Sequence, residues 1–279
     1  MSQLIKFSSL ALLVFTIAFS SCGTTNKLST KEVLLRFQPK NGDNYVMKMD
    51  LTMNMEGPQS MTMLMTMVNG IKVNNLDKAG SFDLDNVISK MTMSVKNPTM
   101  NIEYDSDNPD MEDVSSKTMH ETMSKMLNVK LTSKMDNRGK VLEMPDLDKI
   151  FGDNPELKGQ LDQMNNSLQN SFISYPEQIV KVGDSWNSEI AIDGQMPMNQ
   201  IFTYTIKEIT ATTVNIDITG TVALDSDMAD GSGTSSGMMT VDRMTGFIRT
   251  SNMKQTISME MMGMTMKIIN DVKLTMTKK

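Results

Sequence analysis

Methionine recurs at every second position in several segments of this chain, and this spacing strongly restricts how those segments can fold. Successive side chains of a β-strand point to opposite faces of a sheet, so residues two apart share a face. The period therefore predicts strands whose thioethers all point to one side. The methionines in these segments are Met47, Met49, Met53, Met55, Met61, Met63, Met65, Met67, Met91, Met93, Met259, Met261, Met264 and Met266.

Alternation of apolar and polar residues extends the strand prediction over most of the chain. Val33, Leu35 and Phe37 alternate and predict a short opening strand. The second half is expected to be nearly all strand, over 202–206, 214–224, 247–261 and 264–276. A turn at Met262-Gly263 separates the last two strands and shifts the methionine parity. The Gly-, Ser- and Asp-rich stretch 225–237 predicts a loop.

Two segments have helical rather than strand spacing. The first is near 113–127, with Asp113 close to its N-cap and Met119, Met123 and Met126 along one face. The second covers 146–170 and restarts at Asn154-Pro155, where proline suits the first helical position. The sequence thus predicts a mainly β (α+β) protein with about two helical inserts.

The expected architecture is a single domain over 33–279, built as a long-stranded antiparallel sheet that is curved or forms a half-barrel. The turn Gly42-Asp43-x-Tyr45 is echoed later by Gly183-Asp184-x-Trp186. Two related halves, 33–145 and 172–279, joined by the helix 146–170, would explain this echo. Chance recurrence of common turn chemistry explains it equally well.

The N-terminus has the features of a secretory signal. Lys6 supplies a positive charge, and the apolar run 10–19 is too short to span a bilayer. The small residues just before Cys22 resemble a bacterial lipobox, which predicts a signal peptide over 1–21, a lipidated Cys22 and a tether over 22–32. Because Cys22 is the only cysteine, the lipidated protein would have no free thiol. We expect attachment to the outer membrane on its periplasmic face, because Cys22 is not followed by an acidic cluster resembling surface-export signals.

Composition argues against several classes of function. A net charge of -6 argues against nucleic-acid binding, which needs a basic face. The only histidine, His120, cannot form a two-histidine zinc motif, and no serine near a glycine-rich turn suggests a nucleophile. The acidic stretches near 105–110 and 225–231 do not have EF-hand spacing. We therefore expect no enzyme activity, no cofactor and no metal site of the histidine, thiolate or carboxylate kind.

Several short motifs resemble a known family. Leu35-Arg36-Phe37-Gln38-Pro39, the two Gly-Asp turns and the hairpin Asp242 to Gly246 are similar to an uncharacterised lipoprotein family of the Bacteroidota, known as a domain of unknown function. The strand plan is also similar to the lipoprotein-carrier half-barrels of the LolA and LppX type. That resemblance implies a curved sheet wrapped around an apolar cavity, and fold alone does not establish function.

The methionine face has three interpretations. It is a cavity for a lipid or other apolar ligand, since methionine adapts to varied apolar shapes, and Trp186 would then contribute stacking. Alternatively, it is a closed core, with Trp186 as a structural anchor in a structural envelope protein. The third interpretation is a Cu(I) site, because thioethers are soft ligands. The expected partners are the membrane, through the anchor, and an apolar ligand or lipidated protein.

Overall fold

A single large antiparallel sheet dominates the computed structural model, which describes residues 31–58, 60–147, 173–192, 197–226, 229–261 and 263–279. Its strands are β2 (Asn44–Glu56), β3 (Met61–Asn74), β4 (Phe82–Asn97), β5 (Met100–Asp105), β6 (Lys130–Met135), β7 (Val141–Glu143), β9 (Ser185–Ile192), β10 (Met198–Ile209), β11 (Thr213–Ser226), β12 (Ala229–Asp242), β13 (Ile248–Met261) and β14 (Met264–Lys278). They lie in the order β7-β6-β4-β3-β2-β14-β13-β12-β11-β10-β9, and β5 pairs with β4.

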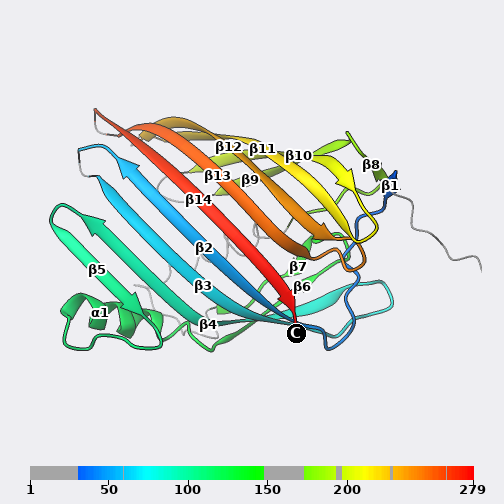
Figure 1. The fold of residues 1–279 in the computed structure, drawn as a ribbon, viewed down its shortest axis with the longest axis horizontal. Helices are drawn as coiled ribbons and strands as arrows, with labels where there is room; N and C mark the ends of the chain where they lie inside the picture. Colours follow the sequence, from blue (N-terminus) through cyan, green and yellow to red (C-terminus); the bar gives the residue numbers. More distant parts are fainter. Residues whose placement is uncertain (1–30, 59, 148–172, 193–196, 227–228, 262) are drawn as a thin grey trace, which may run out of the picture.

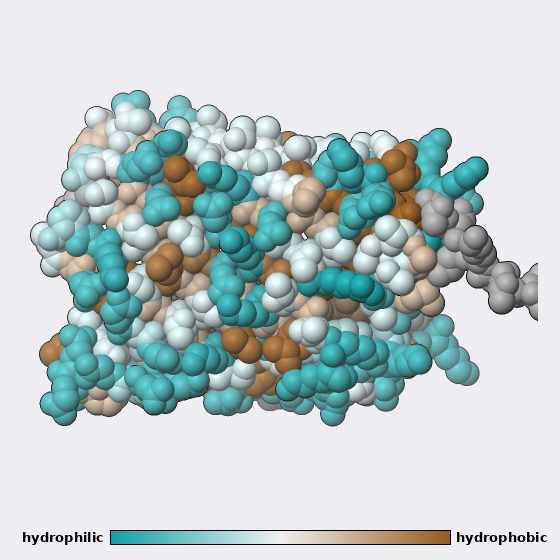
Figure 2. Space-filling view, in the orientation of Figure 1, coloured by the Kyte–Doolittle hydropathy of each residue, from teal (hydrophilic) through white to brown (hydrophobic). Residues whose placement is uncertain are grey.

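The sheet is strongly curved and does not close, since the described strands β7 and β9 end its order on opposite sides. Figure 1 shows the long strands running diagonally, with β9 and β10 curling behind β13 and β14. The face seen in Figure 2 is mostly hydrophilic, as expected for the convex side. The prediction of a mainly β protein with a curved antiparallel sheet is confirmed, and its open form is consistent with a half-barrel.

The predicted strand parity is confirmed by the register of the hairpins. Met259 lies opposite Met266, and Met261 lies opposite Met264, so the register places the two methionine pairs as the parity predicts. The connecting turn contains Gly263 at φ +74°, a left-handed conformation that glycine adopts without steric cost. The parity shift in the sequence is therefore the consequence of a tight hairpin.

The prediction of a loop over 225–237 is wrong over most of its length. Residues 229–237 belong to β12, which pairs with β11 on one side and β13 on the other. Its inward positions include Gly231, Gly233 and Gly237, so no apolar alternation was visible in the sequence. A Cβ on Gly233 would lie 2.5 Å from the Thr256 carbonyl oxygen. Glycine is needed here because the backbones approach too closely for a side chain, as at the bends of curved sheets.

The first predicted helix is confirmed as α1, Val114–Met123. The side chain of Asp113 is its N-cap and accepts a hydrogen bond from the Ser116 amide at 2.7 Å. The second predicted helix, 146–170, lies outside the described residues apart from its first two. The count of two helices is thus not reached in the described part of the chain, where α1 is the only helix assigned. No helix there is long and apolar enough to cross a membrane.

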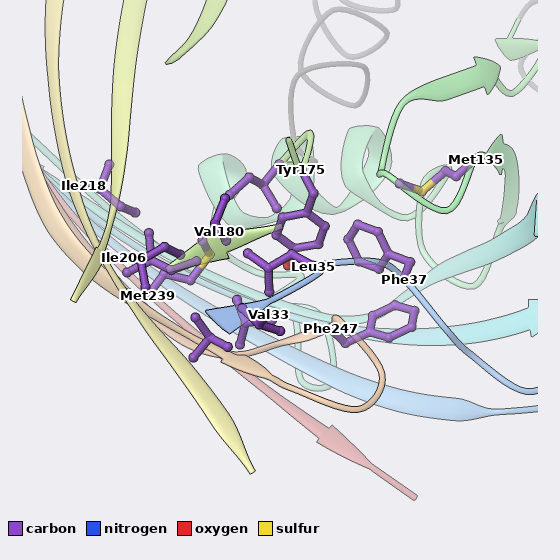
Figure 3. Packing of buried hydrophobic residues seen from close by; sticks show 14 of the residues in the cluster. Val33, Leu35, Phe37, Met135, Tyr175, Val180, Ile206, Ile218, Met239 and Phe247 are labelled. Carbon is purple, nitrogen blue, oxygen red and sulfur yellow. The ribbon is translucent and has the colours of Figure 1, made fainter. Parts of the chain in front are cut away.

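The main hydrophobic core fills one end of the curved sheet. Leu35 and Phe37 from the N-terminal segment lie beside Tyr175 and Phe247 (Figure 3). The Phe37 ring is 5.1 Å from Tyr175 and 5.2 Å from Phe247, and such aromatic pairs each stabilise a core by about 1 kcal/mol beyond burial. The buried Tyr175 hydroxyl donates to the Gly246 carbonyl at 2.7 Å.

The predicted opening strand is shorter than expected. Only Glu32–Val33 (β1) is paired, with Val180–Lys181 (β8). The alternating burial of Val33, Leu35 and Phe37 is nevertheless present. Beyond β1 the backbone of this segment forms hydrogen bonds with turns instead of pairing with a strand. For example, the Phe37 amide donates to the Asn137 carbonyl at 2.7 Å.

The two Gly-Asp turns have the same hydrogen bonds. In the first turn, the Gly42 amide donates to the Val73 carbonyl, and the Val73 amide donates to the Asp43 carbonyl. In the second, Gly183 and Asp184 make the same pair of bonds with Ile206. Duplication and shared turn chemistry both predict this pattern, so two related halves remain a prediction.

Candidate ligand-binding face

The methionine ladder forms a continuous surface on the inner face of the sheet. On β2 and β3, directly opposed pairs are Met49 with Met67, Met53 with Met63, and Met55 with Met61. On β3 and β4, Met67 lies opposite Met91, and Met65 lies opposite Met93. Side chains so paired have Cβ atoms about 5 Å apart. We call the β2, β3 and β4 methionines from Met49 to Met93 the methionine strip.

Most of the methionine strip is half-buried. Met49, Met53, Met63 and Met67 are neither buried nor exposed, whereas Met91 is 5 % exposed. On the hairpin of β13 and β14, Met259 is also 5 % exposed, Met266 is intermediate and Met264 is 43 % exposed. A closed core would bury all of these side chains. The graded exposure instead describes an inner face that is only partly covered.

Two closed hydrophobic clusters lie beside the strip rather than within it. The main core includes Tyr45 and Ile71 at one end of β2 and β3, and Met47 packs against it. A second cluster joins Val222, Leu224, Ile257 and Met259, and Met266 packs against it. Among the described residues, neither cluster includes the half-buried methionines Met49, Met53, Met63 or Met67.

Trp186 lies at the start of β9, at the edge of the main core. Its ring stacks on Tyr204 at a centroid distance of 5.3 Å, and its Nε1 donates to the Ser174 carbonyl at 3.0 Å. Burial raises the pKa of Tyr204 to about 12, so this phenol stays neutral. These contacts anchor Trp186 to the core, away from the methionine strip.

The other candidate residues of the sequence are Cys22 and His120. Cys22 is outside the described residues. His120 is on α1, with its Nδ1 3.4 Å from the Tyr104 hydroxyl. Within the described residues, no group of three or more His, Cys, Asp and Glu side chains is placed to hold a metal ion.

A concave region lies along β2, β3, β4 and β5. This open groove of about 620 Å³ includes Asp50 and Thr66 from β2 and β3, and Glu103 and Asp105 from β5. Asp50 accepts hydrogen bonds from Lys48 at 2.8 Å and Thr66 at 2.6 Å, and these bonds hold the pKa of its carboxyl below the ordinary value. The groove also includes Leu51, Met65 and Met93, so polar and apolar residues of both strand parities line it.

Several inward polar residues were missed by the sequence analysis. Gln255 lies between Met253 and Ile257 on the inner face of β13, and Asn270 lies between Ile268 and Val272 on that of β14. Asn69 interrupts the methionine parity of β3 and is 5 % exposed. The signal was available as polar residues at positions where the period requires apolar ones.

Comparisons with known proteins concern the family and the fold. A family of unknown function, DUF6263, matches residues 156–248. No curated protein matches. A solved structure of lipovitellin, described as showing lipid–protein interactions, aligns with 86 % of this chain at a TM-score of 0.51 and 9 % identity. The match covers 25 % of the lipovitellin chain.

An outer-membrane channel from Pseudomonas putida F1 aligns with 86 % of this chain and 97 % of its own, at 8 % identity and a TM-score of 0.33. At such low identity, the likeness to lipovitellin shows the fold alone. What this chain shares with that protein is a large curved antiparallel sheet.

Proposed function

We propose that this protein is a lipid-anchored envelope protein that binds an apolar ligand, or the acyl chains of a lipidated partner, on the methionine strip. The observation that carries the proposal is the half-burial of paired methionines beside two closed clusters. A continuous apolar surface inside a concave sheet is a common form of ligand site.

The side-chain chemistry suits acyl chains of varied shape. Methionine is unbranched and polarizable, so a row of thioethers can repack around ligands of different length. Burying one methylene group contributes about 0.8 kcal/mol, so a chain of about twelve carbons gains roughly 10 kcal/mol before the cost of association. Lipovitellin, which shares the fold, is described in terms of lipid–protein interactions, and this supports a lipid as the ligand.

The proposed anchor is a diacylated Cys22 at the periplasmic face of the outer membrane, as in the Bacteroidota lipoproteins that the sequence resembles. The nine residue steps from Cys22 to Lys31 would allow at most about 32 Å between the anchor and the described chain. At that end, the exposed side chains Leu34, Ile179 and Met244 border a groove of about 320 Å³. Figure 2 shows brown atoms at this end of the molecule, and such apolar exposure next to an anchor suits contact with a lipid surface.

Methionine oxidation provides a direct test of ligand binding. The protein would be treated with dilute hydrogen peroxide, with and without vesicles containing dimyristoylglycerol, and sulfoxides would be mapped by peptide mass spectrometry. We expect Met49, Met53, Met63 and Met67 to oxidise in the free protein and to be protected by the lipid. Met238, which is 62 % exposed on β12, serves as the control that oxidises in both samples.

Two results would contradict the proposal. Resistance of the strip to peroxide in the free protein would favour a structural protein with a closed core. Oxidation of the strip to the same extent with and without lipid would exclude ligand binding there. The anchor has its own test, since an N-terminal peptide beginning at a diacylated Cys22 should be found in membrane-extracted protein.

A second candidate function is Cu(I) binding, favoured by the row Met49–Met67–Met91 across three adjacent strands. Three neighbouring thioethers offer the soft ligands that Cu(I) prefers. Anaerobic Cu(I) titration against a competing chelator should then show tight binding that Met67→Leu weakens and the outer-face variant Met238→Leu does not. Equal affinity in both variants would rule out this row as a copper site.

A further inference from the structure

A chain of uncharged polar side chains crosses the inner face beside the methionine strip. The Gln255 Nε2 donates to the Ser235 Oγ at 3.1 Å and lies 3.4 Å from the Gln200 Oε1. The Asn270 Nδ2 donates to the Gln255 Oε1 at 3.2 Å. We call Gln200, Ser235, Gln255 and Asn270 the polar seam.

The polar seam depends on the tight curvature of the sheet. Gln200 is on β10 and Gln255 is on β13, with β11 and β12 between them in the strand order. At the level of Gln255 the intervening strands have small inward residues, Ser235 and Gly220. Gln200 lies one inward position further along β10, opposite Val222, and its amide reaches that of Gln255 across this gap. The seam therefore lies across the concavity, next to the second hydrophobic cluster that includes Ile257.

One atom of the seam is buried without a hydrogen-bond partner. The Asn270 Oδ1 is inaccessible to solvent and accepts no hydrogen bond from the described residues, although the Nδ2 of the same side chain is bonded to Gln255. A buried acceptor left unsatisfied is costly, and buried polar groups in native proteins are nearly always paired. The bond from Nδ2 to Gln255 orients this oxygen, and a ligand donor reaches it when the side chains that exclude solvent from it move aside.

The neighbours of Asn270 connect the acceptor to the methionine strip. Asn270 lies directly opposite Met53 on β2, and Met53 lies opposite Met63 on β3. The seam itself carries amide and hydroxyl groups and no charge. A neutral donor group of the ligand is therefore favoured here over a charged one, because no opposite charge in the seam would compensate a buried ion.

We propose that the Asn270 Oδ1 accepts a hydrogen bond from a neutral hydroxyl group of an amphiphilic lipid whose acyl chain lies on the methionine strip. The ligand class is thus an uncharged acyl lipid with a free hydroxyl group, such as a diacylglycerol, rather than a hydrocarbon or an anionic lipid. This assignment rests on the proposed function and specifies the part of the ligand that is not apolar.

The test compares two probes that differ in a single donor. Dimyristoylglycerol has a free hydroxyl group, and its 3-O-methyl ether has the same acyl chains without that donor. Native mass spectrometry of the membrane-extracted protein would measure competition between them. We expect the wild-type protein to prefer the free hydroxyl by about ten-fold, the usual scale for one buried hydrogen bond.

Asn270→Leu removes the acceptor at nearly constant volume, so it should abolish the preference while the methyl ether still binds. Asn270→Ser keeps a small polar group and provides a second variant if Asn270→Leu fails to fold, which Trp186 fluorescence would reveal. It should reduce the preference, because the shorter hydroxyl cannot hold the acceptor at the same position. Asn252→Leu, on the outer face of β13, is the matched control and should leave the preference unchanged.

The outcomes separate this inference from the proposed function. If neither probe binds the wild-type protein, the proposed function itself is wrong. Equal binding of both probes to the wild-type protein would show that the seam does not recognise the hydroxyl group. The same conclusion follows if Asn270→Leu and Asn270→Ser both retain the wild-type preference, and in either case the proposed lipid site is retained. A stronger affinity for dimyristoylphosphatidylglycerol than for dimyristoylglycerol would also overturn the neutral-donor assignment.

Discussion

Individual glycines in the turns have different roles that their conformations alone do not reveal. Gly183 and Gly246 both have positive φ, at +93° and +74°. A Cβ on Gly183 would meet nothing within 4 Å, whereas a Cβ on Gly246 would overlap the Arg36 carbonyl and lie 2.9 Å from the Phe37 amide nitrogen. One glycine serves only the turn, and the other also holds the N-terminal segment against the core.

We expect Gly183→Ala to lower the free energy of unfolding by about 1 kcal/mol, the cost of a left-handed alanine. Gly246→Ala should cost about 3 kcal/mol or more, because the backbone of residues 36–37 must move as well. Urea denaturation followed by Trp186 fluorescence would measure both. Similar midpoints for the two variants would show that the close approach of Arg36 is unimportant.

Asp43 makes the stability depend on pH. Its Oδ1 lies 2.7 Å from the Lys278 Nζ, and its Oδ2 accepts from the Lys40 amide at 3.0 Å. Burial raises the pKa of this carboxyl, but the bonds to Lys278 and Lys40 outweigh burial and lower it. A lowered pKa in the folded state means that the stabilisation is complete above the unfolded pKa of about 3.9 and is lost as the pH falls through the folded pKa.

Asp43→Asn should therefore destabilise the protein at pH 7, and the difference from wild type should shrink as the pH falls below about 4. Urea unfolding at pH 7, 5 and 3 would measure this change. In a Lys278→Met background, Asp43→Asn should have a smaller effect at pH 7. An effect of the same size in both backgrounds would exclude the ion pair as its cause.

At the scale of elements, sequence period predicted some strands well and hid others. β2 and β3 were predictable because their inward residues are apolar at every second position, and α1 was predictable from Asp113 and its helical spacing. β12 was not, because curvature replaces its inward apolar residues with glycine, and the remaining Ser, Thr and Asp are typical of loops. In this element the tertiary fold overrides local propensity.

The glycines of β12 should be essential for the curvature. In Gly233→Ala, the new methyl group would be 2.5 Å from the Thr256 carbonyl oxygen and 2.9 Å from the Ile257 Cγ1, so β12 and β13 must separate. We expect a loss of about 2–4 kcal/mol and faster amide hydrogen exchange along β13. Ser232→Ala, on the exposed face of the same strand, should change stability by less than about 0.5 kcal/mol. Equal exchange in both variants would show that the bend tolerates a side chain.

At the scale of the molecule, the order of the strands in the sheet could not be predicted from sequence patterns. The pairing of β2 with β14 joins residues more than 200 positions apart, and no local period specifies it. The main core likewise combines Leu35 and Phe37 with Tyr175 and Phe247, from segments that are remote in the chain. For the candidate site, the shared face of the methionines was predictable, but the polar seam was not, because Gln200 and Gln255 meet only once the sheet has curled.

We expect the methionines of the strip to lower the stability of the whole sheet and to make its inner face adaptable. Isoleucine has a higher β-propensity and loses less side-chain entropy on burial, so Met53→Ile with Met63→Ile, an opposed pair, should raise the melting temperature by a few degrees. A stiffer strip should also accept fewer acyl-chain lengths. Calorimetry and native mass spectrometry with diacylglycerols of ten to eighteen carbons would measure both effects.

Met238→Ile, on the outer face, should leave the range of chain lengths unchanged. A double variant that is more stable and binds the full range would show that methionine is not needed for adaptability, and a double variant that is less stable would show that the strip is packed as a closed core.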